Sequence, residues 1–404
     1  MSGMNALLQA LAAAERHGDE AVLATVVKVE GSAYRRPGAR MLIAPYGNTV
    51  GSISGGCLEA DVAKKAWWLT ESGEPVLRRY STGASEDEDD ADAALTFGLG
   101  CNGTVYVLLE RHGRARQATV VELLRQVRDS QLPGAAATVI AAYPRAPVRV
   151  GERLLLAPDG HLGGTLRQPR LDARVRHDLA ATLAQQQSAL RVYAEPRGEV
   201  EVFFEYVAPP RRLVVFGAGH DAQPLVRLAK LLEWQVTVVD GRAHFARAER
   251  FPEADAVLVA EPQRSPALAA LAALTAGAAV VVMTHSYSQD RHWLGAVLQG
   301  APCYVGQLGP RERTERLLGE IRTQGASLPA LAALHYPMGL DLGGDTPESV
   351  AMAILAEISA VLNRRSGGML RQGEAPIHPP STVIHERLAA PAVVERMDGV
   401  RGSR

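Results

Sequence analysis

Apolar runs and amphipathic stretches alternate along the chain, and in the first half this pattern occurs twice. The pattern predicts strands at 21–29 and 40–44 and a helix at 58–70. A shift of 113 residues aligns 24–53 with 137–166 without a gap, and twelve of the thirty aligned positions are identical. The sequence therefore predicts a duplicated α+β unit whose two copies pack together.

The end of the repeat aligns at a different shift. Gly103–Glu110 resembles Gly198–Glu205 at a shift of 95, so about eighteen residues of the first copy, near 81–100, are missing from the second. We assign the first copy to 1–112 and the degenerate second copy to 113–208. Features common to both copies are interpreted as scaffold, whereas features found only in the first are candidates for function.

The second half has the strand–helix alternation of a Rossmann-like domain. A strand at 213–216 leads into Gly217–Ala222, a G-x-G-x-x-A sequence that opens a helix. Further strands are predicted at 236–239, 256–259, 280–283 and 303–305. We therefore predict an α/β protein in which the duplicated unit precedes a doubly wound parallel sheet over 211–365. The tail at 366–404 is rich in proline near 376–380, and we expect it to be flexible.

The glycine-rich turn is a candidate phosphate site. Gly217 and Gly219 would let backbone N–H groups near His220 approach a phosphate at a helix N-terminus. Asp240 lies 21 residues after Gly219, at the end of the next predicted strand, where Rossmann domains place an acid that binds a ribose. NAD(P) or another nucleotide is therefore a candidate ligand. The alternative is that the glycines serve only close packing of the strand against the helix.

Composition excludes several classes of protein. The chain of 404 residues is 47% apolar and 22% charged, as is ordinary for folded domains, and its formal net charge of -1 gives no general attraction to nucleic acid or anionic membranes. The apolar stretch 266–283 is interrupted by Thr275 and Gly277, so we predict a short helix and a buried strand there rather than a membrane span. The first twenty residues do not resemble a signal peptide, and a cytoplasmic protein is expected.

Cys57 is the main chemical candidate of the first copy. It follows Gly55 and Gly56 and precedes Glu59 at a predicted helix start, where the helix dipole lowers the pKa of a thiol and favours bound anions. The corresponding stretch of the second copy, 165–170, has lost both glycines and the cysteine. The alternative is a small buried cysteine in a tight turn.

Other candidates are weighed in the same way. Cys101 follows Gly100 in a second glycine-rich turn and has the same alternatives, whereas Cys303 lies in a strand pattern and is expected in the core. Arg35 is a candidate ligand of a phosphate or carboxylate, because a guanidinium binds such anions through two hydrogen bonds. Arg36 recurs in the second copy, which favours a structural role.

A polar cluster follows the predicted strand at 280–283. His285, Asp290 and His292 lie where open α/β sheets bind ligands, and they could transfer protons or bind a metal. The alternative is a set of surface polar groups. The sequence contains no C-x-x-C pair, so we predict no metal ligands, and no catalytic residue is assigned.

Six segments together resemble the XdhC/CoxI family of maturation factors for molybdenum hydroxylases such as xanthine dehydrogenase. They lie in order and cover most of 20–364. They are GSAYRRPGARML (31–42), GSISGGCLEA (51–60), FGLGCNGTVYVLLE (97–110), VVFGAGHDAQPL (214–225), VTVVDGRAHFARAERFP (236–252) and PMGLDLGGDTPESVAMAILAEI (337–358). Two positions depart from the family pattern: Asn102 replaces a glycine and Pro310 replaces a serine.

The resemblance implies an accessory protein that binds molybdenum cofactor, supports its sulfuration by a cysteine desulfurase and inserts it into an apo molybdenum hydroxylase. Cys57 and Cys101 fall on the GGC and GLGC motifs of the family, and a metal ligand, a sulfur relay and packing remain open roles for them. Molybdopterin carries a phosphate and oxidisable sulfurs, which glycine turns and the Arg35 guanidinium could hold.

A second class of function stays open beside the first. The Rossmann half could serve an NAD(P)-dependent oxidoreductase, although no lysine follows Lys230 for a Tyr-x-x-x-Lys pair. We favour a cofactor-binding chaperone over a catalyst. A homodimer is expected, since the cysteine half of one protomer could meet the Rossmann half of another.

Overall fold

The computed structural model describes residues 3–56, 58–81, 103–113, 120–260, 266–374 and 382–387. The chain divides into two compact units, one formed by 2–209 together with 380–404 and the other by 210–379. Both sequence repeats belong to the first unit.

Each repeat contributes a helix, three strands, a second helix and two further strands. The first repeat comprises α1 (Met4–His17), β1 (Ala21–Gly31), β2 (Arg40–Ile43), β3 (Thr49–Gly51), α2 (Glu59–Leu69), β4 (Val76–Ser81) and β5 (Gly103–His112). The second comprises α3 (Val120–Ser130), β6 (Gly134–Ala142), β7 (Arg153–Leu156), β8 (Leu162–Gly164), α4 (Pro169–Gln185), β9 (Ala189–Glu195) and β10 (Gly198–Val207).

The two sheets of this unit have the same strand order. One runs β3-β2-β1-β5-β4 and the other β8-β7-β6-β10-β9, with β17 (Val383–Arg387) added beside β9. Even an irregularity is repeated: Val27 in β1 and Ile140 in β6 are each left unpaired where the register shifts against β5 and β10. These residues are 113 positions apart, so topology and register both confirm the predicted duplication.

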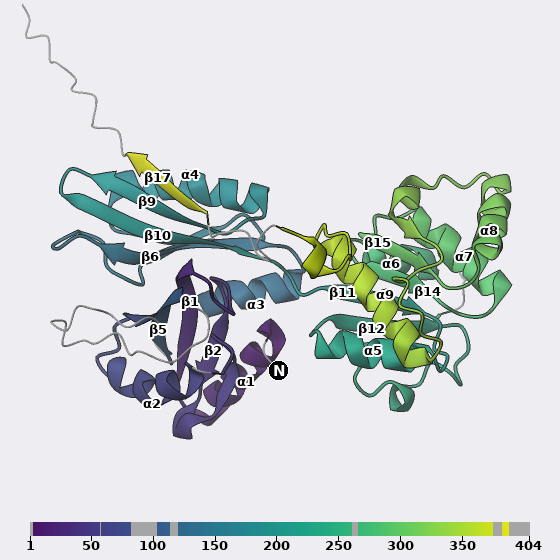
Figure 1. Ribbon diagram of the computed structural model, residues 1–404, viewed down its shortest axis with the longest axis horizontal. Helices are drawn as coiled ribbons and strands as arrows, with labels where there is room; N and C mark the ends of the chain where they lie inside the picture. The colour runs from purple at the N-terminus through teal and green to yellow at the C-terminus, as the bar shows by residue number, and fades with distance from the viewer. Residues whose placement is uncertain are drawn as a thin grey trace, which may run out of the picture. The chain divides into compact units, whose positions relative to one another are not determined.

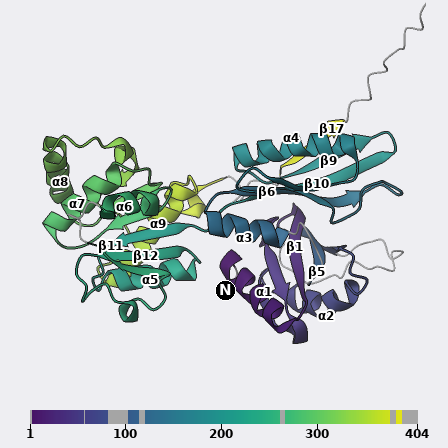
Figure 2. The same ribbon diagram turned by 180° about the vertical axis from the view of Figure 1, so that it is seen from behind.

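The two sheets pack face to face with helices outside and between them. Val27, Leu108, Ile140, Leu190 and Phe203 form a core cluster to which both sheets contribute. The helices α1 and α3 pack against each other and against apolar residues of both sheets. Helix α2 covers the outer face of the first sheet and α4 that of the second (Figures 1 and 2). The repeats therefore share one core.

The second unit is built on a six-stranded parallel sheet. Its strands are β11 (Arg212–Phe216), β12 (Gln235–Asp240), β13 (Ala256–Val259), β14 (Ala279–Val282), β15 (Tyr304–Gln307) and β16 (Leu334–His335). They lie in the order β13-β12-β11-β14-β15-β16, and every pair is parallel. This is the predicted Rossmann order, and it reverses direction between β11 and β14, where such sheets bind ligands.

Helices cover both faces of the parallel sheet. Packed on one face are α5 (Ala222–Leu231) and α9 (Pro347–Leu362), and on the other are α6 (Pro266–Thr275), α7 (Tyr287–Leu298) and α8 (Arg311–Thr323). Short 3-10 helices lie at Pro45–Gly47, Ala248–Arg250, Pro329–Ala333 and Leu370–Gln372. The apolar stretch near 266–283 is a helix and a buried strand, as predicted. In the described part of the chain, no helix is both long and apolar enough to cross a membrane.

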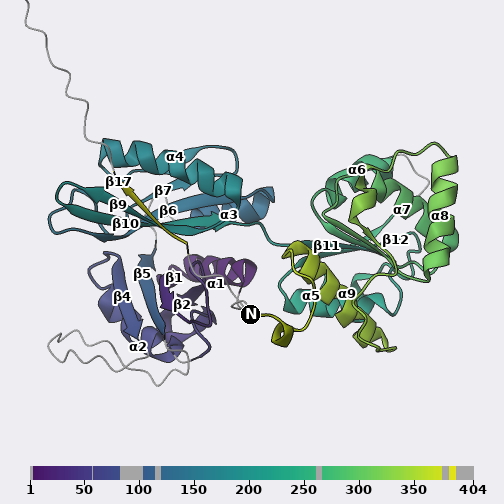
Figure 3. The ribbon, with the colours of Figure 1, turned by 45° about the horizontal axis from the view of Figure 1, so that its top comes forward.

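Two local expectations were wrong. Cys303 is exposed rather than in the core, because β15 begins one residue later and its buried aromatic residue is Tyr304. Within the tail, Val383–Arg387 forms a strand parallel to β9 (Figure 3). Glu386 in this strand accepts hydrogen bonds from Arg174 and Arg191, so long-range ion pairs order a segment without a strong apolar pattern.

Candidate functional site

The loop between β3 and α2 is folded around the carboxylate of Glu59. Its Oε1 accepts hydrogen bonds from the Ser52 hydroxyl at 2.8 Å and from the N–H groups of Ile53 and Ser54 at 3.2 and 2.8 Å. Its Oε2 accepts from the Ser54 hydroxyl and from the N–H of Gly56 at 3.1 Å. Glu59 therefore holds the loop in place from the first turn of α2, and its predicted direct contact with a cofactor stays a prediction.

These hydrogen bonds shift the pKa of Glu59. Burial alone raises the pKa of the carboxyl, but the hydrogen bonds from Ser54 and Ser52 outweigh burial and lower it from 4.5 to about 2. The carboxyl is therefore ionised at neutral pH. The loop that carries the GGC motif is thus organised around a fixed negative charge.

Gly55 and Gly56 keep the outer side of this loop open. Gly56 has a φ of 114°, which a residue with a side chain rarely adopts, and no atom lies within 4 Å of where its Cβ would be. The ring of Tyr34 lies 3.5 Å from the corresponding position at Gly55, and Tyr34 is 63% exposed. Cys57, the next residue of the motif, lies outside the described residues.

Arg35 connects the loop to a neighbouring pocket. Its Nε donates a hydrogen bond to the carbonyl of Ser54 at 3.3 Å. The pocket has a volume of about 360 Å³, and its lining includes Arg35, Ser52, Glu205 and the apolar residues Met4, Leu7 and Leu124. Arg40 also lines it but forms an ion pair with Glu205. The exposed Arg35 guanidinium is therefore the charge that this pocket offers to an anionic ligand.

The second repeat retains the loop scaffold without the ligand-facing groups. Asp172, at the position equivalent to Glu59, accepts hydrogen bonds from the Leu166 N–H at 2.7 Å and from the Thr165 hydroxyl at 2.9 Å. Val148, at the position equivalent to Arg35, is buried in the core. Arg170 replaces Cys57 and lies in the first turn of α4. The carboxylate is thus scaffold in both repeats, whereas Arg35 is specific to the first.

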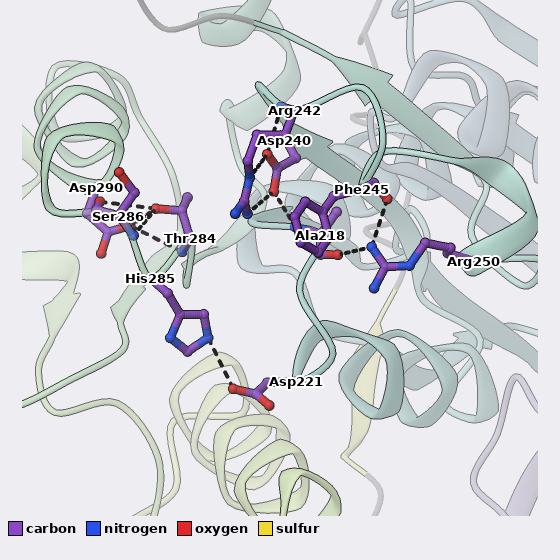
Figure 4. Close-up of polar contacts among 10 residues, drawn as sticks. All are labelled: Ala218, Asp221, Asp240, Arg242, Phe245, Arg250, Thr284, His285, Ser286 and Asp290. Atoms are coloured by element: carbon purple, nitrogen blue, oxygen red, sulfur yellow. Dashed lines mark hydrogen bonds and ion pairs between the residues drawn. The ribbon is translucent and has the colours of Figure 1, made fainter.

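A second candidate site lies at the C-terminal edge of the parallel sheet. Gly217 follows β11 with a φ of 118°, and a Cβ there would lie 2.5 Å from the carbonyl oxygen of Met283. A side chain is therefore excluded where the turn meets the end of β14. Gly219 and the exposed His220 follow in the turn that precedes α5. The predicted glycine turn thus lies at the point where the strand order reverses (Figure 4).

Asp240 is turned inward at this edge. Its side chain is 0% exposed, Oδ2 accepts from the Ala218 N–H at 2.8 Å, and Oδ1 accepts from the N–H of Arg242 at 2.9 Å. The Arg242 guanidinium donates through Nε to Oδ1 at 3.0 Å and through Nη2 to Oδ2 at 2.8 Å. The four acceptor sites of the carboxylate are therefore occupied, and none is left for the ribose that the sequence predicted as its ligand.

The pKa of Asp240 reflects the same contacts. Burial raises the pKa of the carboxyl, but the hydrogen bonds from the Arg242 side chain and from the Ala218 and Arg242 N–H groups outweigh it and hold the pKa below its usual value. Asp240 is therefore an ionised clamp on the glycine turn. Its predicted spacing was right, and its predicted ribose contact is not supported by this geometry.

His285 faces the glycine turn from the end of β14. Its Nε2 lies 3.1 Å from Oδ2 of Asp221, the residue before α5, and its Cδ2 lies 3.8 Å from where a Cβ of Gly219 would be (Figure 4). The φ of His285 is 58°, in the left-handed region that non-glycine residues rarely occupy. A backbone outlier at a ligand-binding edge points to a functional constraint on this histidine.

The other residues of the predicted polar cluster point elsewhere. Asp290 is buried and accepts hydrogen bonds from Thr284, Gln307 and Arg313, so it ties the ends of β14 and β15 to α8. His292 donates to or accepts from the backbone of its own helix. Among the described residues, no three His, Cys, Asp or Glu side chains are grouped as a metal site requires.

The structure gathers the described site residues into two groups. Around the loop in the first unit lie Arg35, Gly55, Gly56 and Glu59, and at the edge of the parallel sheet lie Gly217, Gly219, His220 and Asp240. Gly100 and Cys101, like Cys57, fall outside the described residues. Sequence reasoning missed Tyr34, Asp221 and Arg242. An alignment of the two repeats pairs Tyr34-Arg35 with Pro147-Val148, and this difference was a usable signal.

Comparisons with known proteins reach both units. A model of the XdhC and CoxI family matches residues 14–81 and again 127–194, and a model of the XdhC Rossmann domain matches 213–358. The two matches of the first model are again 113 positions apart. The repeat found in the sequence is therefore a repeat of one family domain.

Named relatives and a solved structure agree with these matches. A Bacillus subtilis protein named as a probable component of xanthine dehydrogenase is 32% identical over 342 residues, which are 84% of this chain and 92% of that protein. The Escherichia coli molybdenum cofactor insertion chaperone PaoD is 23% identical over 365 residues, 90% and 88% of the two chains. A Bacillus halodurans crystal structure described as a xanthine dehydrogenase has a TM-score of 0.66 and 28% identity, covering 93% of this chain and 98% of that one.

Proposed function

Because this chain belongs to the XdhC and CoxI family, we propose that it is a maturation factor for a molybdenum hydroxylase. In this proposal it binds molybdenum cofactor, supports its sulfuration and inserts it into the apo form of a xanthine dehydrogenase-type enzyme. The names of two relatives support it: one is called a molybdenum cofactor insertion chaperone, and the other is named for xanthine dehydrogenase.

The difference between the two repeats carries the proposal. Both repeats fold the same loop around a carboxylate, Glu59 or Asp172, but only the first has Gly55, Gly56 and Cys57 there. Arg35 lies beside this loop, whereas its counterpart in the second repeat is buried. A duplicated scaffold that keeps these groups in one copy supports a ligand site in that copy.

The pocket beside the loop suits an amphipathic anion. Molybdopterin combines a flat ring system with a phosphate, and the pocket combines the guanidinium of Arg35 with apolar walls from Met4, Leu7 and Leu124. A guanidinium binds a phosphate through paired, charge-assisted hydrogen bonds. We therefore place the cofactor at this pocket, with the GGC motif at its rim, and assign Arg35 to the phosphate.

Sulfuration and insertion require other proteins to reach the bound cofactor. We propose a cysteine desulfurase as the sulfur donor and the apo hydroxylase as the acceptor of the finished cofactor. Support comes from the open side of the loop, where Gly56 faces free space and Tyr34 and Arg35 are exposed. A homodimer in the cytoplasm is part of the proposal, and the molar mass in solution tests the dimer.

Nucleotide binding by the Rossmann unit is a separate part of the proposal. The strand order, the glycine turn after β11 and the nearby His285 support a phosphate-containing ligand at the sheet edge. Mass spectrometry of the freshly purified protein distinguishes the two classes of function. A bound pterin phosphate would support the maturation factor, whereas stoichiometric nicotinamide nucleotide with turnover would support an oxidoreductase.

The decisive experiment compares Cys57→Ser with Arg170→Ala, the equivalent position in the second repeat. Each variant is co-expressed with the client hydroxylase, and client activity, cofactor content and melting temperature are measured. Cys57→Ser removes a soft sulfur ligand and a group with a pKa of about 8.5. We expect it to reduce cofactor content and client activity at an unchanged melting temperature, and Arg170→Ala to reduce neither.

The outcome against the proposal is equally specific. Full activation of the client by the Cys57→Ser variant, with normal cofactor content, would assign Cys57 to packing. An unchanged client in the complete absence of this protein would overturn the maturation function itself. The melting temperature separates either result from a simple loss of folding.

A further inference from the structure

The charged group that faces outward at the end of β12 is a guanidinium rather than a carboxylate. Asp240 is fully buried and its four acceptor sites are filled, whereas the side chain of Arg242, two residues later, is 33% exposed. Arg242 uses Nε and Nη2 to hold Asp240. Its Nη1 makes no hydrogen bond to any described residue, so this nitrogen can donate to a ligand.

Aromatic packing keeps the Arg242 guanidinium in place. Its Cζ lies 4.1 Å from the centroid of the Phe245 ring, and the Cζ of Arg250 lies 4.9 Å from the same centroid. Arg250 in turn donates through Nη1 to the carbonyl of Ala218 at 2.8 Å (Figure 4). The guanidinium of Arg242 is therefore fixed before a ligand arrives, and a fixed donor loses less entropy on binding.

The charge around this position is positive. Arg242 and Arg250 both lie against Phe245, and the exposed Arg247 follows on the same segment. Within the described ranges, the carboxylate that Arg242 contacts is that of Asp240 alone. Rossmann domains that bind an unmodified ribose present a free carboxylate here to accept from its hydroxyls, whereas an arginine accommodates a phosphate on that ribose. The side chains at the end of β12 match the second case.

We propose that the Rossmann unit selects a nucleotide whose ribose carries a phosphate group, and that Arg242 is the residue that recognises this phosphate. The inference rests on the proposed binding of a nucleotide at the glycine turn and adds its chemical class. Arg242 binds the ribose phosphate, while Asp240 positions Arg242 and the turn and does not touch the ligand.

Isothermal titration of the full-length protein with NADP⁺ and NAD⁺ tests the proposal, because these probes differ by one ribose phosphate. We expect NADP⁺ to bind about tenfold more tightly or better, the gain from a charge-assisted phosphate contact. Arg242→Ala should remove this preference and bring the two affinities to within about threefold, since the rest of the dinucleotide is unchanged. Arg247→Ala, an exposed arginine on the same segment, should keep the preference.

A second variant guards against misfolding. Arg242→Ala leaves the buried Asp240 without its cation, so Arg242→Lys is measured beside it, which keeps a positive charge and loses the paired geometry. It should give an intermediate preference. Equal affinities in the unmodified protein, a preference for NAD⁺, or binding of neither probe would overturn the inference. Client activation by the same protein is scored separately, so a failure here is distinguishable from a failure of the maturation function.

Discussion

Arg40 in the first repeat forms an ion pair with Glu205 in the second, and Arg153 in the second repeat forms the same pair with Glu110 in the first. Shifts of 113 and 95 residues relate the two arginines and the two glutamates. All four side chains are at least nine-tenths buried. Each repeat thus supplies the charge that the other must neutralise, which makes the duplicated unit stable only when both copies are present.

Removing Glu205 should destabilise the first unit. Glu205→Ala leaves the buried guanidinium of Arg40 without its carboxylate, and breaking a buried pair in this way costs about 3–5 kcal/mol of the free energy of unfolding. Glu110→Ala should cost a similar amount, because its pair is the repeat-related equivalent. Urea denaturation, followed by circular dichroism, measures both.

Arg125→Ala is the matched control for this experiment. Arg125 pairs with Glu15 in the same unit, but both side chains are largely solvent-accessible, so its loss should change the free energy of unfolding by less than about 1 kcal/mol. If Glu205→Ala were as mild as this control, the cross-repeat pair would not contribute to holding the copies together.

Acid should weaken the loop that Glu59 organises. The pKa of Glu59 is lowered from 4.5 to about 2 in the folded state, so its contribution to stability is fully present above about pH 4.5 and is lost as the pH falls toward 2. Glu59→Gln removes this titration, and the unfolding free energy of the variant should fall less steeply than that of the parent between pH 5 and 3. Urea denaturation at several pH values measures the slopes.

Glu71→Gln, at an exposed position just after α2, controls for the loss of one negative charge. It should leave the parent's slope unchanged. Identical slopes for the parent and Glu59→Gln would show that the hydrogen bonds in the loop do not favour the ionised carboxylate.

Local signals explain how much of the fold the sequence predicts. The strand at 279–282 is buried on both faces and was recognisable as an apolar run between helices. The duplication was recognisable from identities such as Arg40 with Arg153. By contrast, β17 depends on ion pairs from Glu386 to Arg174 and Arg191, which are about two hundred residues away. Such pairing leaves no periodic trace in the sequence.

The same distinction applies to the candidate sites. The spacing from Gly219 placed Asp240 at the correct strand end, but the direction of its carboxylate depends on Ala218 and Arg242 in three dimensions. Similarly, the motif predicted the glycine loop, whereas the inward role of Glu59 emerges only from its contacts. Sequence spacing therefore identified where these carboxylates lie, and tertiary contacts decide what they touch.

Arg35 should matter for ligand retention and little for stability. Arg35→Ala removes an exposed guanidinium that makes one hydrogen bond to the loop, so the free energy of unfolding should change by less than about 1 kcal/mol. Loss of a charge-assisted phosphate contact should weaken cofactor binding about tenfold or more. Molybdenum and pterin content of the purified protein measures this effect.

Arg167→Ala supplies the control for Arg35. Arg167 is exposed on the equivalent loop of the second repeat, where it pairs with Glu152. The control should retain the parent's cofactor content. Equal retention by Arg35→Ala would remove Arg35 from the proposed site and leave the pocket without its phosphate ligand.

His285→Gly should separate binding from stability at the Rossmann edge. With a φ of 58°, His285 occupies a conformation that costs a side-chain-bearing residue about 1–2 kcal/mol, and glycine avoids this strain at an entropic cost of about 0.5–1 kcal/mol. The variant should therefore be as stable as the parent or more stable by up to about 1 kcal/mol, yet bind nucleotide more weakly, because the imidazole beside Gly219 and Asp221 is gone. Glu233→Gly, at a φ of 61° after α5 in the same unit, should change stability in the same direction and leave nucleotide affinity intact. Unchanged affinity in His285→Gly, measured by titration calorimetry beside urea denaturation, would mean that the strained histidine serves the turn and not the ligand.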